Sequence, residues 1–149
     1  MNKKIVNNLV SFSHASLIAS GFANTYAVST TYYLWDMLYN DISLMYLYHH
    51  ISAILFILYE SREQLVIDTM YYAELSNLPV CLVYHCMKLG IPCPRLQWFE
   101  VVWFGYFRIV VLGRLMLEYW TNESILYYNM CLMYFFGIYW WIKQIIKLK

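Results

Sequence analysis

Charged residues are scarce in this chain of 149 residues. They make up 13% of the sequence, and the formal net charge is +1, whereas an ordinary soluble domain is about 25% charged. A protein that binds nucleic acid needs a basic surface to neutralise phosphates. We therefore expect no nucleic-acid partner.

Clusters of metal-ligating residues are also missing from the sequence. The four cysteines form no CxxC pair, and the four histidines form no HxxH pair. Zinc sites and histidine-box oxygenases depend on such spacings. We therefore predict no metal site and treat metal-dependent oxidation or hydrolysis as the weakest functional hypothesis.

Hydrophobic residues, by contrast, reach 62% of the sequence, above the 45–50% or so of soluble domains. Because a membrane span needs about 20 mainly apolar residues, this surplus predicts a polytopic, all-α membrane bundle that forms one domain over residues 1–149. Breaks rich in Gly, Pro, Asn or Ser divide the chain into six expected spans. These spans cover about residues 5–23, 25–40, 42–59, 65–88, 97–118 and 124–142.

The basic residues predict how this bundle is oriented. Lysines are concentrated near both termini, and cytoplasmic loops are enriched in Lys and Arg. Six spans place both termini in the cytoplasm, in an internal membrane that we expect to be the endoplasmic reticulum. The apolar N-terminal stretch continues to about Phe22 and contains His14, so we interpret it as a retained span rather than a signal peptide.

Five of the six expected spans contain ionisable residues in their interior. Such residues usually face the inside of a bundle and pair with one another. They are His14, Asp36, His49, His50, Glu74 and Arg108.

Each of these residues also has a purely structural interpretation. His14 suits a core histidine bonded to Ser11 or to a backbone carbonyl, and Asp36 suits a boundary position if its span is shifted. Glu74 and Arg108 suit a buried pair that only supports the structure.

The adjacent histidines His49 and His50 favour a function more strongly. Neighbouring helical positions differ by about 100°, so the two rings cannot address the same point. One imidazole can face a cavity while the other is held by a neighbour such as Asp36. A base with an orienting carboxylate is a recurring catalytic arrangement.

Five segments in this order resemble the TLC domain, the membrane module shared by ceramide synthases, translocating-chain-associated proteins and TLC-domain-containing proteins. The stretch around Asp68 and Glu74 has no paired aspartates, so the chain resembles the TLC-domain-containing branch more than a ceramide synthase. The segments are VSFSHASLIASG, TTYYLWDML, YLYHHISAILFI, AELSNLP and WFGYFRIVV.

This resemblance implies a role in lipid metabolism or lipid homeostasis, with membrane lipids as partners. If the chain is an enzyme, the resemblance implies acylation of an amino lipid, as in ceramide formation, with acyl-CoA as co-substrate and no bound cofactor. His49, His50 and Asp36 are then the catalytic candidates, and His14, Glu74 and Arg108 the substrate-binding candidates. The alternative is a non-catalytic protein that binds, senses or transports lipids. The sequence does not predict an oligomeric state.

Overall fold

Helices account for nearly all of the structure, as predicted. The computed structural model describes residues 3–21, 24–40, 43–60, 62–118 and 125–148. Within these ranges the elements are α1 (Lys3–Ala19), α2 (Thr25–Tyr39), α3 (Leu44–Tyr59), α4 (Glu63–Lys88), α5 (Pro94–Gly105), the π-helix η1 (Tyr106–Val111), α6 (Leu112–Glu118) and α7 (Ile125–Lys147).

The helix ends follow from local capping chemistry. Asn24 caps α2 by accepting the Ala27 N–H at 3.0 Å, and Ser43 caps α3. At the end of α4, Gly90 adopts φ +70°, while the N–H of Ile91 donates to the Cys86 carbonyl. This is a Schellman stop, which requires a left-handed residue and therefore favours glycine. Pro94 then occupies the first turn of α5, where its missing N–H has no cost.

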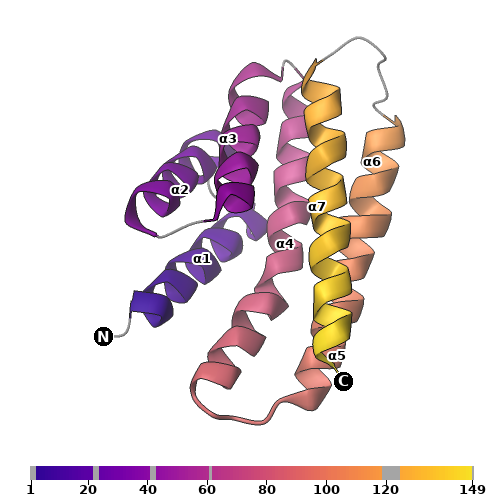
Figure 1. Ribbon diagram of the computed structural model, residues 1–149. Helices are drawn as coiled ribbons and strands as arrows, with labels where there is room; N and C mark the ends of the chain where they lie inside the picture. The colour runs from indigo at the N-terminus through magenta and orange to yellow at the C-terminus, as the bar shows by residue number, and fades with distance from the viewer. Residues whose placement is uncertain (1–2, 22–23, 41–42, 61, 119–124, 149) are drawn as a thin grey trace.

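The helices form an upright group with a smaller set packed against it. Figure 1 shows α4, α7 and the continuous run α5, η1 and α6 standing side by side, with α1, α2 and α3 against one side of α4. Helix α1 contacts α4 most extensively, and α2 packs on α3 and α1. The long helix α4 is therefore the element that joins the two halves of the bundle.

A proline within α4 lies where the lower part of this helix diverges from α7. Pro79 lies inside α4, and a proline in a helix interior removes one backbone hydrogen bond and kinks the helix. Figure 1 shows the lower half of α4 diverging from α7. The divergence leaves room between α4 and α7 at this end of the bundle.

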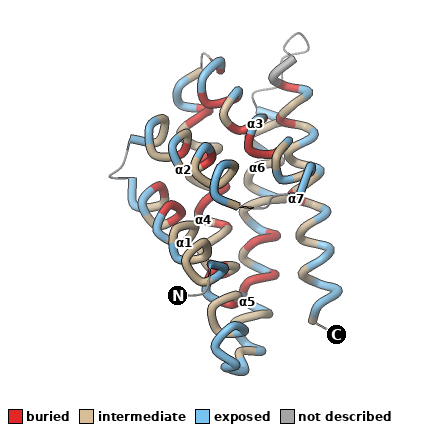
Figure 2. The backbone as a smooth tube through the Cα atoms, turned by 60° about the vertical axis from the view of Figure 1, so that its left-hand side comes forward, coloured by how far each residue is buried: buried red, intermediate tan, exposed pale blue. Residues whose placement is uncertain are grey.

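The core lies where α2, α3 and α4 meet. Ile57, Leu65 and Val66 are almost completely buried there, and Figure 2 shows buried positions recurring along α4. Several polar residues are buried as deeply as the apolar core. They are His14, Ser29, His49, His50, Ser52, Glu74, Ser76 and Glu100.

The structure corrects the prediction of a membrane protein. Within the described residues, no helix combines the length and the apolar character needed to span a membrane. The predicted six-span polytopic membrane bundle, its cytoplasmic termini and its placement in the endoplasmic reticulum are therefore wrong.

The physical reasons lie in helix length and in the kind of residue counted as hydrophobic. Helices α1, α2 and α3 have 17, 15 and 16 residues, short of the roughly 20 that a span needs. The longer α4 carries Asp68 and Glu74 within it. The hydrophobic count also includes 16 tyrosines, whose hydroxyl groups are polar.

Candidate functional site

Two histidine–carboxylate pairs lie in the interior of the bundle. His50 Nδ1 of α3 is 3.4 Å from an Asp36 carboxylate oxygen of α2. His14 Nδ1 of α1 is 3.5 Å from a Glu74 carboxylate oxygen of α4. The structure therefore brings together four of the six candidate residues as two pairs from four different helices.

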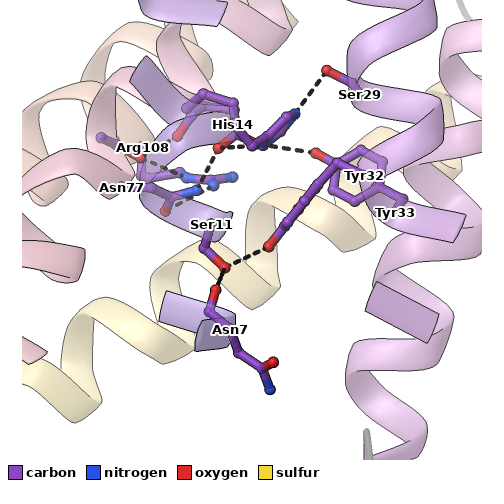
Figure 3. Close-up of polar contacts among 11 residues, drawn as sticks. Asn7, Ser11, His14, Ser29, Tyr32, Tyr33, Asn77 and Arg108 are labelled. Atoms are coloured by element: carbon purple, nitrogen blue, oxygen red, sulfur yellow. Dashed lines mark hydrogen bonds and ion pairs between the residues drawn. The ribbon is translucent and has the colours of Figure 1, made fainter. Parts of the chain in front are cut away.

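His14 is held firmly by α2. Its Nε2 lies 3.1 Å from the Ser29 hydroxyl, and its ring stacks on Tyr32 with centroids 4.0 Å apart. Figure 3 shows this arrangement, together with the hydrogen bond from Tyr32 to Ser11. Ser29 and Tyr32, one helical turn apart on α2, thus fix both the tilt and the position of the imidazole.

Glu74 is a carboxylate whose charge is fully supported by its neighbours. The Tyr33 hydroxyl donates to one oxygen at 3.1 Å, and the Asn77 amide donates to the other at 3.0 Å. Burial alone would raise the pKa of Glu74, but His14, Arg108 and the Asn77 amide outweigh it and lower the pKa to about 2. Glu74 is therefore ionised throughout the neutral range.

Arg108 reaches this cluster from η1. Its Nε donates to the Ser76 hydroxyl at 2.8 Å, and its guanidinium lies 5.6 Å from the centre of the Phe104 ring. Burial lowers the pKa of Arg108, with Glu74 and Tyr33 acting in the opposite direction. Within the described residues, Arg108 forms no direct ion pair with Glu74. Neutral side chains therefore hold the guanidinium in place.

Tyr33 links the two pairs, and the sequence analysis missed it. Besides donating to Glu74, its ring centroid lies 5.0 Å from that of His50 and 5.8 Å from that of His14. Its exposed fraction is 4%. A tyrosine among 16 gives no signal of its own, although its position three residues before Asp36 on α2 places it one turn away on a similar face.

The two adjacent histidines point to different surroundings, as the helical geometry predicts. His49 Nδ1 lies 3.1 Å from the Met133 sulfur of α7, and its ring meets Trp140 edge to face. Burial, Arg108 and His50 lower the pKa of His49 to about 3. Of the two, His50 is the one oriented by a carboxylate.

A polar cavity of about 520 Å³ extends from this cluster to the lower end of the bundle. His50, Glu74 and Arg108 line its inner part, and Lys143 and Lys147 of α7 line it as well. His14 and Asp36 do not line it. They contact Glu74 and His50 on the side away from the cavity. That His14 contacts substrate stays a prediction.

Glu100 of α5 lines the same cavity and was also missed from the sequence. It is 8% exposed, and no hydrogen bond or ion pair from another described residue reaches its carboxylate. Burial raises the pKa of Glu100 to about 7, although Lys147 acts to lower it. A buried carboxylate without a partner is costly, which marks this position for a ligand.

A second, apolar cavity of about 70 Å³ adjoins the polar one. Four methionines, Phe56 and Leu112 contribute to its wall. Tyr33, His49 and Arg108 line both cavities. The two cavities therefore meet at these three side chains, next to the histidine–carboxylate pairs.

No group of three or more metal-ligating side chains converges among the residues that the structure describes.

No protein family, curated protein or solved structure matches the chain. The comparisons thus leave the TLC resemblance a prediction, and they give no support to the expectation of ceramide chemistry. The function has to be argued from the two cavities and the side chains between them.

Proposed function

We propose that the protein binds an amphipathic acyl compound across the two cavities and transfers its acyl group to an amine. The observation that carries this proposal is the shared wall of the cavities at Tyr33, His49 and Arg108. Ligand sites are typically apolar with a few placed polar groups. An acyl chain in the apolar cavity places its carbonyl carbon at this wall, within the reach of the polar groups.

His50 is the general base in this proposal. Its Nδ1 faces Asp36, which leaves Nε2 on the opposite edge of the ring for the cavity that His50 lines. Burial lowers the pKa of His50, against the effect of Asp36 and Glu74. The imidazole is therefore neutral at pH 7, which is the form that accepts a proton.

The transfer balances with an acyl thioester as donor. His50 Nε2 takes a proton from the acceptor amine as the nitrogen attacks the carbonyl carbon, and a C–N bond forms. The C–S bond then breaks, and the departing thiolate receives the proton from His50. Arg108, at the junction of the cavities, stabilises the negative charge that develops on the carbonyl oxygen.

Glu100 supports an amine as the acceptor. Its carboxylate lines the polar cavity, and no described residue donates a hydrogen bond to it. An ammonium group of the acceptor could bind there and pass one proton to the Glu100 carboxylate, which leaves the neutral amine that attacks the carbonyl carbon. Glu74 is less suited to this role because Tyr33, Asn77 and His14 already occupy its oxygens.

Binding without transfer is the second candidate, and the distances within the pairs favour it. The separations of 3.4 and 3.5 Å exceed the usual hydrogen-bond range of about 2.7–3.2 Å. Catalytic hydrogen bonds also tighten on substrate binding, so an activity measurement has to decide between the candidates.

The test is acyl transfer by the purified full chain, with an acyl-CoA donor and a primary amine acceptor. We expect His50→Ala to abolish transfer and Asp36→Asn to reduce it by about 10²-fold or more, while both variants still bind the acyl donor. His85→Ala is the matched control, because His85 lies outside both cavities and bonds Asn8. Binding without turnover in the wild type supports the second candidate, and equal turnover in wild type and His50→Ala excludes His50 as the base.

A further inference from the structure

We infer that the apolar cavity selects a short acyl chain of about three to four carbons, the carbonyl carbon included. This inference rests on the proposed function, since it names the chain that the acyl compound carries. An apolar cavity of about 150 Å³ holds benzene, a ligand of six carbons, and this cavity measures about 70 Å³. At the same volume per carbon, the space holds about three carbons beyond the carbonyl and not a long fatty chain.

The far wall of the cavity is the packed core of the protein. Ala53, Phe56, Met70 and Met130 line the cavity and also belong to the buried cluster that contains Ile57. Their exposed fractions range from 3% to 9%. Extending a chain past them means displacing close-packed side chains, and overpacking of this kind is destabilising.

The side chains that the two cavities share fix the direction in which the chain lies. Tyr33, His49 and Arg108 stand where the apolar cavity meets the polar one. The acyl carbonyl, which is polar, belongs at that junction, and the terminal methyl belongs against the core. Chain length is therefore measured from the junction to the core wall, and the wall sets the limit.

Gly137 of α7 offers a direct way to shorten the cavity. It lines the cavity, and a Cβ atom built there would lie 3.9 Å from the Arg108 Cδ atom, an ordinary contact distance. Gly137→Ala therefore fills part of the space without a clash. Alanine is also a better helix former than glycine, so the variant is expected to fold.

The experiment measures transfer with a straight-chain series from acetyl-CoA to palmitoyl-CoA. For the wild type we expect the highest kcat/KM at propionyl or butyryl, with palmitoyl at least about tenfold lower. Gly137→Ala should shift the optimum toward shorter chains, and Met116→Ala, which enlarges the cavity, toward longer ones. Leu132→Ala, on the exposed side of α7, is the control and should leave the optimum unchanged.

The outcomes separate this inference from the proposed function. An optimum at dodecanoyl or longer, or identical optima in the wild type, Gly137→Ala and Met116→Ala, overturns the short-chain inference and leaves acyl transfer standing. If no acyl-CoA is turned over, calorimetric titration with butyrate, hexanoate and palmitate decides the inference. Tighter binding of hexanoate than of palmitate supports the short-chain inference, although the transfer proposal fails. Tighter binding of palmitate overturns the short-chain inference as well.

Discussion

Replacing Glu100 with glutamine should stabilise the protein at alkaline pH and change little in acid. The wild-type carboxylate accepts no hydrogen bond from a described residue, and burial raises its pKa from the ordinary 4.5 to about 7 against the opposing effect of Lys147. A raised carboxyl pKa means that the folded state holds the proton more tightly than the unfolded state. The associated stability is fully present below the unfolded pKa and is lost as the pH rises through 7.

The size of this effect follows from the pKa difference. Each pKa unit corresponds to about 1.4 kcal/mol, so the shift from 4.5 to about 7 sets an upper limit of about 3.5 kcal/mol. Glu100 lines a cavity that reaches solvent, which screens part of the penalty. We therefore expect the folded state to lose on the order of 1–3 kcal/mol between acid and alkaline conditions through this residue.

The assay is urea unfolding of the wild type and Glu100→Gln at pH 4.5 and pH 8.5, with the difference in unfolding free energy taken at each pH. Taking the difference cancels the other titrating groups. We expect a difference close to zero at the lower pH and a more stable variant at the higher pH. Glu118→Gln, at an exposed position, is the matched control. The reasoning is refuted if the Glu100→Gln difference is the same at both pH values.

Three further perturbations test the cluster and its packing. Glu74→Gln should reduce the loss of stability in acid. The pKa of Glu74 is lowered to about 2, so its contribution to stability is present above the ordinary value of 4.5 and is lost as the pH falls toward 2. Acid titration followed by circular dichroism measures this loss, and an unchanged acid transition would contradict the prediction. Ser76→Ala should cost about 1–3 kcal/mol in urea unfolding, because it removes the acceptor of the Arg108 Nε–H; a variant as stable as the wild type would show that this hydrogen bond contributes nothing. Gly105→Ala should cost about 1–3 kcal/mol and lower the melting temperature, because its Cβ would lie 2.6 Å from the Trp141 ring nitrogen; an unchanged melting temperature would mean that Trp141 moves aside freely.

The helices were predictable because capping and turn residues mark their ends in the sequence. Gly90 and Pro94 mark the turn between α4 and α5, and Asn24 marks the start of α2. The membrane environment was predicted wrongly because composition treats tyrosine as apolar and does not report helix length. A count of hydrophobic residues includes every tyrosine, although its hydroxyl group is polar and can form hydrogen bonds inside the bundle. Tyr33 forms such a bond with Glu74.

The candidate site was predictable in part, for reasons that differ between residues. The pairing of one histidine with Asp36 followed from the 100° step between His49 and His50, but which of the two it would be depended on how α3 packs. The choice of Glu74 as partner for His14 also depended on packing, since these residues lie 60 positions apart in sequence on α1 and α4. Glu100 carried only a weak signal, as an acidic residue within the apolar stretch QWFEVVWF.

The π-helix makes the position of Arg108 depend on chain length as well as on side-chain chemistry. A π-turn holds one residue more than an α-turn, so deleting a single residue from Tyr106–Val111 would allow α5 and α6 to join as one regular α-helix. Because the wider turn takes up the extra residue, the deletion would leave the faces of α5 and α6 unchanged and would redirect only residues within the segment, Arg108 among them. The guanidinium would then lose its contact with Ser76 while α6 keeps its packing on α7. A one-residue deletion in this segment would therefore dismantle the cluster even if every chemical group in it were retained.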